Sequence, residues 1–284
     1  MSFSSVSRIV FVALFGGLIF ISCDDSESEP PKGFIEIEFD NVVGSRQLQL
    51  AGVGSTEYPY ENAMDQAFNV TTLRYYISSV RFEGRNGEVF EDEVSVDATS
   101  SEGYFLVDES VSGSTLLVFD DIPQGSYNRV TFTVGVDSSG VVEGAAGGAL
   151  DISNSMFWNW NAGYIAMKFE GQSPASLGGA NGEIIQPDNP EGFAYHIGGW
   201  KNIEGLPFVY NNKTITLEFD GNATVTEENR PHIHVLVDIN AMLSGGHTVD
   251  FSTDADIHRP LDGQDFANNI PSAFRYDHIH IESN

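Results

Sequence analysis

Most of the chain alternates apolar and polar residues with a period of two, which is typical of β-strands. The alternation starts at Phe34, and no long helical periodicity interrupts it. Gly- and Pro-bearing turns separate the alternating segments, so we predict an all-β fold, an antiparallel β-sandwich with long loops. The predicted strands are 34–39, 68–82, 89–90, 104–107, 115–119, 127–136, 164–170, 193–197, 214–219 and 232–239.

One or two short helices and a structured corner complete the predicted elements. The helices are expected at 240–243 and around 266–274. The stretch 171–192 is rich in Gly, Pro and Ser and is predicted to be a long loop inside one domain that spans 34–284. The segment 122–127 is typical of a sandwich corner, in which the Tyr127 ring turns inward and its hydroxyl bonds backbone.

The N-terminus has the pattern of an export signal. Arg8 precedes an apolar run of 13 residues, Ile9 to Ile21, which is shorter than the roughly 20 residues of a membrane span and suits a signal peptide. We predict that residues 1–22 are a lipoprotein signal peptide and that Cys23 is lipid-modified. Cys23 is the only cysteine in the chain, which excludes a disulfide within the monomer.

An acidic segment at 23–33 follows the signal and is expected to be a solvated, extended tether. It resembles the acidic stretch of surface-exported lipoproteins from Bacteroidota-type bacteria. The expected location is therefore the outer membrane, with the domain facing the periplasm or the cell surface. Contact with the membrane is expected only through the lipid anchor.

Charge and composition exclude two classes of protein. The chain has 13 Lys and Arg against 41 Asp and Glu, a formal net charge of -28. Nucleic-acid binding needs clustered Lys and Arg, so a nucleic-acid partner is excluded. The 41% of hydrophobic residues can bury a large core, which excludes a disordered chain.

Two His-x-His pairs, His232 with His234 and His278 with His280, are the main candidates for chemistry. Residues two apart in a strand share one face, so each pair is expected to point outward. Apolar residues between and beside them, among them Ile279 and Ile281, are expected to point inward. If the strands are neighbours, four imidazoles meet, enough for copper or zinc. Alternatively, these are ordinary polar positions on half-solvated strands.

Other residues offer weaker chemical signals. Trp158 and Trp160 are explained by core packing, or form a modified or redox-active aromatic site near a metal. His196, beside aromatic residues, is either a structural group or a further metal ligand. A group of aspartates suggests a possible calcium site: Asp254, Asp256, Asp262 and Asp265. Gly-x-Ser-x-Gly and Gly-rich nucleotide motifs are absent from the sequence, and we expect that the protein is not an enzyme.

Several segments resemble the MbnP-like family of exported, copper-binding-type proteins. The most specific are the Trp-x-Trp-x-x-Gly-Tyr block from Trp158 to Tyr164 and the Tyr-His-Ile-Gly block that begins at Tyr195. The resemblance covers most of 34–240. The segments that carry it are 73–82, 122–127, 132–138, 150–151, 156–164 and 193–199.

The resemblance implies a β-sandwich associated with copper acquisition. In some members a dihaem peroxidase-type partner oxidises a tryptophan to kynurenine, and histidines complete the copper site. Trp158, Trp160, Tyr164 and His196 match the family pattern. Copper-binding members have a histidine where this chain has Ser78, and another where residues 138–142 have none. The resemblance therefore implies a copper site that is absent or rebuilt from other histidines.

These observations favour a lipid-anchored, exported metal-binding protein, with copper as the expected ion. The first alternative is a surface module for a glycan or protein, with Trp158, Trp160 and Trp200 as stacking platforms. The second is a metalloenzyme that uses the His-x-His pairs and needs an enclosed pocket with an open coordination position.

Overall fold

The computed structural model describes most of the chain from Pro31 onward, and residues 31–284 form one compact unit. The predicted signal peptide, Cys23, most of the acidic tether, Trp160 and Trp200 lie outside the described residues. Within the described part, no helix has the length and apolar character needed to cross a membrane. The described residues are Met1, 31–137, 146–158, 163–178, 189, 191–199, 204–205 and 207–283.

The smaller of the two main sheets, sheet A, has five strands. In sheet A, β17 pairs with β15 and β15 pairs with β1, while β2 and β9 both pair with β1. The β1–β15 pair is parallel and the others are antiparallel. The strands are β1 (Lys32–Val43), β2 (Arg46–Gln47), β9 (Leu116–Pro123), β15 (Asn229–Asp238) and β17 (Phe274–Ser283).

Sheet B has ten strands, six of which follow one another in the order β14-β10-β4-β12-β13-β16. Strands β3, β5 and β8 also pair with β4, and β11 pairs with β12. Only β13–β16 is parallel among its described pairs. The strands are β3 (Tyr60–Glu61), β4 (Ala67–Glu83), β5 (Val89–Glu91), β8 (Tyr104–Asp108), β10 (Gly125–Val134), β11 (Phe157–Trp158), β12 (Gly163–Gln172), β13 (Gly192–Gly198), β14 (Lys213–Val225) and β16 (Asp256–Ile257).

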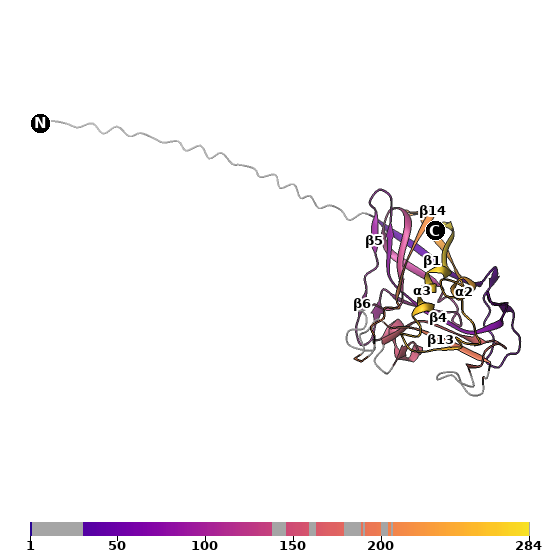
Figure 1. Cartoon of the computed structure of the whole chain (residues 1–284). Coiled ribbons are helices and arrows are strands. Elements are labelled where there is room, and N and C mark those ends of the chain that lie inside the picture. The colour runs from indigo at the N-terminus through magenta and orange to yellow at the C-terminus, as the bar shows by residue number, and fades with distance from the viewer. Residues whose placement is uncertain are drawn as a thin grey trace. The chain divides into compact units, whose positions relative to one another are not determined.

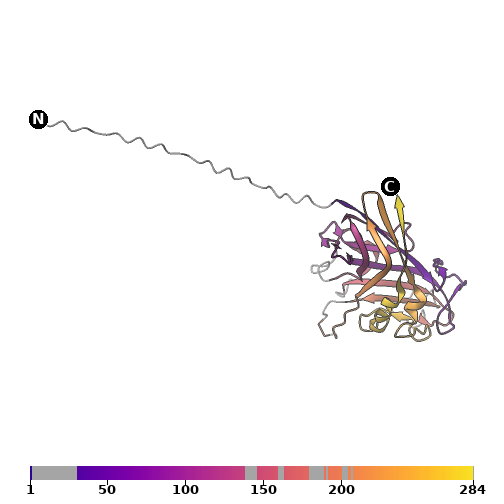
Figure 2. The same cartoon turned by 90° about the horizontal axis from the view of Figure 1, so that it is seen from above.

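Short elements connect or cap the two sheets. A small ribbon joins β6 (Ser95–Val96) to β7 (Ser101–Glu102), and two single-turn helices are η1 (Gly148–Leu150) and η2 (Ile152–Asn154). Two α-helices lie wholly within the described residues, α2 (Ile239–Leu243) and α3 (Gln264–Ala273), close to the two predicted helices. Helix α3 contacts β13 and β14 of sheet B as well as β15 and β17 of sheet A (Figures 1 and 2).

The core lies between the two sheets and confirms the predicted all-β sandwich. Alternate residues of β15 enter it, so that Ile233, Val235 and Val237 are fully buried. At the predicted corner, the Tyr127 hydroxyl donates a hydrogen bond to the Pro123 carbonyl oxygen at 2.8 Å. Since the inward residues of β15 are committed to the core, its polar residues are left on the outer face of sheet A.

Two segments differ from the expected pattern. Ile281 is 45% exposed, so its predicted inward placement is wrong. Ile281 pairs with Pro231 near the end of β17, which is an edge strand of sheet A. A register shift between β15 and β17, next to His234, lies just before this part of β17. The alternation of apolar and polar residues predicts neither the edge position nor the register shift. The predicted loop 171–192 is shorter than expected, because β12 continues through Gln172 and β13 already starts at Gly192.

Candidate metal centre

Sheet A brings the two His-x-His pairs side by side. In the register of β15 and β17, His232 lies opposite His280 and His234 lies opposite His278. Ring centroids are 4.6 Å apart for the first of these pairs and 4.4 Å apart for the second. We call these four residues the histidine cluster. The sequence left their adjacency open, and the antiparallel pairing of β17 with β15 provides it.

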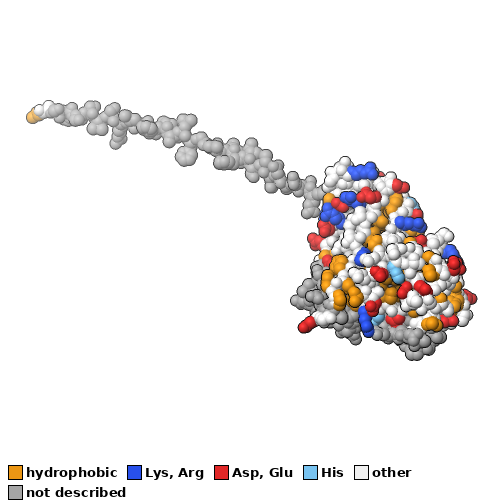
Figure 3. All heavy atoms as spheres, in the orientation of Figure 1, with side chains coloured by type: hydrophobic (Ala, Val, Ile, Leu, Met, Phe, Trp, Pro, Cys, Tyr) orange, Lys and Arg blue, Asp and Glu red, His pale blue; other side chains and the backbone are white. Residues whose placement is uncertain are grey.

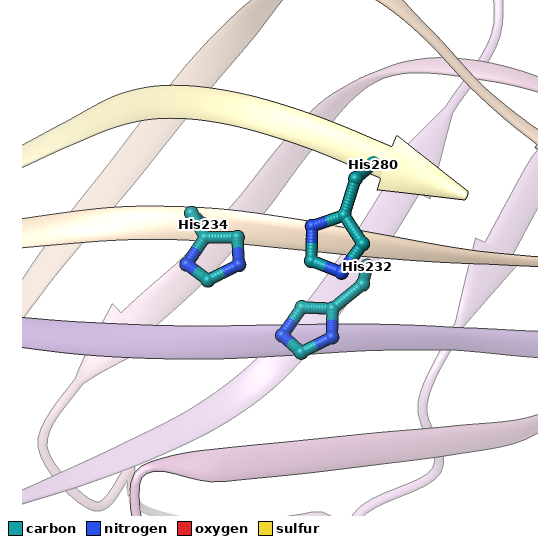
Figure 4. A group of neighbouring side chains, drawn as sticks. All are labelled: His232, His234 and His280. Atoms are coloured by element: carbon teal, nitrogen blue, oxygen red, sulfur yellow. The ribbon is translucent and has the colours of Figure 1, made fainter. Parts of the chain in front are cut away.

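Three members of the histidine cluster converge: His232, His234 and His280. Each offers a ring nitrogen, and these nitrogens all lie within 4.8 Å of one another. Figure 4 shows the His280 ring reaching from β17 toward His232, with His234 beside them on β15. Nitrogen ligands lie about 2.0–2.1 Å from a zinc ion, so the three side chains would have to move closer together to bind one ion.

The fourth member, His278, lies at the edge of the histidine cluster. Its side chain is 54% exposed, and its Nδ1 lies 2.8 Å from a carboxylate oxygen of Asp277. Its ring nevertheless stacks on that of His234 with an interplanar angle of 4°. His278 therefore links the buried part of the cluster to solvent.

Carboxylates of β1 flank the histidines on the other side of β15. The parallel register places Glu36 beside His232 and Glu38 beside His234. Glu38 Oε2 lies 3.1 Å from His232 Nε2, and Asp40 Oδ2 lies 2.7 Å from His234 Nδ1. A carboxylate bound to one imidazole nitrogen fixes the ring orientation and makes the other nitrogen a better metal ligand.

The Nε2 atom of His234 has the environment of a metal ligand. This nitrogen is buried and has no hydrogen-bond partner among the described residues, and it lies 3.9 Å from Glu38 Oε2. When Asp40 accepts the Nδ1 proton, Nε2 carries the lone pair. A buried polar atom without a partner costs about 1–3 kcal/mol, and a bound cation would remove that cost. The residues present therefore fit a nitrogen-bound metal ion.

His196, the fifth predicted ligand, is not part of the histidine cluster. It lies on β13 in sheet B, and its Nε2 is 2.7 Å from Glu170 Oε1. Burial raises the pKa of Glu170, but the His196 hydrogen bond and the Lys168 charge outweigh burial and lower it to about 2. His196 is thus engaged in a hydrogen bond with Glu170, away from the histidine cluster.

Trp158 lies on β11 in a second core cluster and is 3% exposed. Its ring meets that of His258 edge to face at 6.0 Å, and the His258 and His196 rings are 5.5 Å apart. Sequence reasoning missed His258, which follows β16 and belongs to no motif. Because Trp158 is buried, it does not offer the exposed stacking surface that a glycan-binding module needs.

Ser78, where the resemblance implies a histidine in copper-binding members, has a side chain that is already engaged. It is fully buried on β4, and its hydroxyl donates to the Gly135 carbonyl oxygen at 2.8 Å. Ser78, Trp158 and His196 all belong to sheet B, whereas the histidine cluster lies on sheet A. These three residues and the converging imidazoles are thus in different sheets.

The four aspartates of the predicted calcium site line one pocket. His247 lies at the same pocket, with its Nε2 3.2 Å from Asp254 Oδ2. No member of the histidine cluster is among the lining residues, so the pocket does not supply the enclosed site that the metalloenzyme alternative requires. The lining residues are His247, Thr253, Asp254, Asp256, Ile257, Asp262, Asp265 and Phe266.

Comparisons with known proteins place the chain in a family. The MbnP family profile matches residues 32–259. The structure is similar to that of MbnP from Methylosinus trichosporium, with a TM-score of 0.52 and 18% sequence identity over 78% of this chain and 80% of that one. That likeness shows a shared fold. Comparison with curated proteins gives no match. The family relation supports a metal-related function, and the chain belongs to the MbnP family.

Proposed function

We propose that this protein is an exported, lipid-anchored metal-binding protein that takes up copper at the histidine cluster. The observation that carries the proposal is the convergence of His232, His234 and His280, with a buried and unsatisfied nitrogen on His234. Export and anchoring are supported by the apolar run before Cys23. The intact mass of protein from its host tests acylation: an unmodified N-terminal segment would contradict it.

The donor set favours a divalent ion of borderline softness. All three converging side chains are imidazoles, and imidazole suits copper, zinc, iron and nickel. Thiolate and thioether ligands, which select Cu(I), do not belong to the set. The affinity of such a site generally rises to Cu(II) and falls again at Zn(II), so Cu(II) is the ion expected to bind most tightly.

The arrangement suits exchange of the ion with solvent or a partner protein. His278 is exposed and stacks on His234, so an incoming ion can meet it before reaching the converging nitrogens. A dihaem peroxidase-type partner is supported only by family resemblance. Its target would be Trp158 or Trp160, of which Trp158 lies on β11.

Copper titration of the metal-free mature protein tests the proposal. We expect His234→Ala to weaken Cu(II) binding at least 100-fold in isothermal titration calorimetry, because the change removes the nitrogen that the site leaves unsatisfied. His247→Ala is the matched control, since His247 also pairs with a carboxylate but lies outside the cluster. Equal Cu(II) affinity in the wild type and His234→Ala would contradict the proposal.

A further inference from the structure

We propose that Arg230 is a positioning residue of the metal centre, which acts through Glu36 to hold the imidazole ring of His232. This inference rests on the proposed function, because the ring that it positions belongs to the histidine cluster. Arg230 Nη1 lies 3.3 Å from Glu36 Oε1, and Glu36 Oε2 lies 3.5 Å from His232 Nδ1. One carboxylate thus lies between a guanidinium group and one of the three converging imidazoles.

Glu36 is buried deeply enough to need a charged partner. Only 7% of the residue is exposed, and it lies opposite His232 in the parallel register of β1 and β15. Among the described residues, Arg230 is the Lys or Arg that pairs with Glu36. Without Arg230 the charge of Glu36 would be uncompensated, and its side chain would be drawn toward water and away from the imidazole ring. Arg230 therefore keeps Glu36 beside His232.

Arg230 is itself held by Phe34. The guanidinium carbon lies over the Phe34 ring, 4.8 Å from its centroid. Phe34 and Glu36 are two residues apart on β1, so they share one face of that strand. Arg230 and His232 have the same spacing on β15. A planar guanidinium group can stack on an aromatic ring while it donates to a carboxylate, which makes Arg better suited than Lys to this position.

The second carboxylate beside His232 has no such anchor. Glu38 Oε2 lies 3.1 Å from His232 Nε2, so a carboxylate flanks each nitrogen of the ring. Among the described residues, the ion pairs of Glu38 are with His232 and His234 and none is with a Lys or Arg. An ion needs one of the two nitrogens, so one carboxylate must give way. Glu38 is the one free to move, and Glu36 stays at Nδ1 in the place that carboxylates commonly take at metal-bound histidines.

Copper binding and magnetic resonance of the full mature chain test this role of Arg230. We expect Arg230→Gln to weaken Cu(II) binding about 10-fold or more in isothermal titration calorimetry, the usual cost of losing a residue that orients a metal-bound histidine. The nitrogen hyperfine splitting in the electron paramagnetic resonance spectrum should change, as should the nitrogen NMR signals of the His232 ring in the metal-free protein. Arg275→Gln is the matched control and should leave all three unchanged. It makes the same charge change at an exposed residue of β17, opposite Leu236.

Glu36→Gln shows whether Arg230 acts through the carboxylate. If it does, the double variant Arg230→Gln/Glu36→Gln binds Cu(II) no more weakly than the weaker single variant. Fully additive losses would overturn the inference, as would equal Cu(II) affinities and spectra in Arg230→Gln and Arg275→Gln; the proposed function would survive both results. No Cu(II) bound by the wild type would overturn the proposed function as well. If Arg230→Gln does not fold by circular dichroism, Arg230→Lys decides: we expect a smaller loss of affinity in the same direction, and wild-type affinity and spectra would overturn the inference.

Discussion

At the scale of single residues, the surroundings of a carboxylate decide its ionisation. Asp92 and Glu170 show opposite effects. Burial, followed by the negative charges of Asp120, Glu102 and Glu93, raises the pKa of Asp92 to about 6. In Glu170, the contacts with His196 and Lys168 outweigh burial and lower the pKa to about 2. Ionisation of Asp92 therefore destabilises the fold, whereas ionisation of Glu170 is favoured in the folded protein.

Asp92→Asn tests the cost of that buried charge. The folded-state pKa of Asp92 is raised from its ordinary value of 3.8 to about 6, so stability is lost as the pH rises between these two values, and the full cost is present above about pH 6. We expect Asp92→Asn to raise the free energy of unfolding by about 1–2 kcal/mol at pH 7, after allowing for solvent screening of a half-exposed group. Below about pH 4, where Asp92 is protonated in both the folded and the unfolded state, urea denaturation should show no gain in the free energy of unfolding from Asp92→Asn. An equal gain at both pH values would contradict the assignment.

At the scale of elements, the position of β15 creates the candidate metal centre. It is the middle strand of three, with acidic side chains of β1 on one side and histidines of β17 on the other. A strand presents alternate residues to one face, so His232 and His234 face the same way while Ile233 enters the core. The site thus depends on the strand order of sheet A.

Close packing between β12 and its neighbours can be tested at Gly171. A Cβ added there would lie 2.1 Å from the Asn69 carbonyl oxygen and 2.5 Å from the Phe193 ring. Since both contacts lie within sheet B, we expect Gly171→Ala to lower the free energy of unfolding by about 2–3 kcal/mol. Gly221→Ala on β14 is the control, because nothing lies within 4 Å of its added Cβ. Equal urea midpoints for the two variants would contradict this packing.

Local patterns predicted the elements well and the contacts between elements poorly. Alternation identified the longer strands and the outward face of His232 and His234, and the Pro- and Gly-bearing turn identified the Tyr127 corner, because each depends on neighbours in sequence. The contact of His232 with Glu38 joins residues 194 positions apart through a parallel strand pair. No local pattern encodes that pairing, so the carboxylate side of the centre was not predicted. The same holds for His258, which approaches Trp158 only through the fold.

At the scale of the whole molecule, the domain carries its candidate metal centre on sheet A, whereas Ser78, Trp158 and His196 lie on sheet B. The formal net charge of -28 favours cations in general, yet acidic side chains are spread over the face visible in Figure 3 rather than gathered in one patch. The overall negative charge of the chain therefore does not determine where a cation would bind. In the proposed function, the ion is selected by the imidazoles of sheet A, which converge on one face.

Binding at the histidine cluster should stabilise the whole domain. A ligand at 100 times its dissociation constant adds about 2.7 kcal/mol to the free energy of unfolding. For a domain of this size, that corresponds to a rise in Tm of about 5–10 °C. We expect Cu(II) to produce this rise in differential scanning calorimetry and His280→Ala to remove most of it. A full rise in His280→Ala would show that the stabilising ion binds elsewhere.

The most direct test of the central claim is a crystal structure of the copper-loaded protein with anomalous data collected at the copper absorption edge. The account predicts a copper peak within coordinating distance of ring nitrogens of His232, His234 and His280, on the outer face of sheet A. A copper peak beside Trp158 and His196, with none at the histidine cluster, would contradict it.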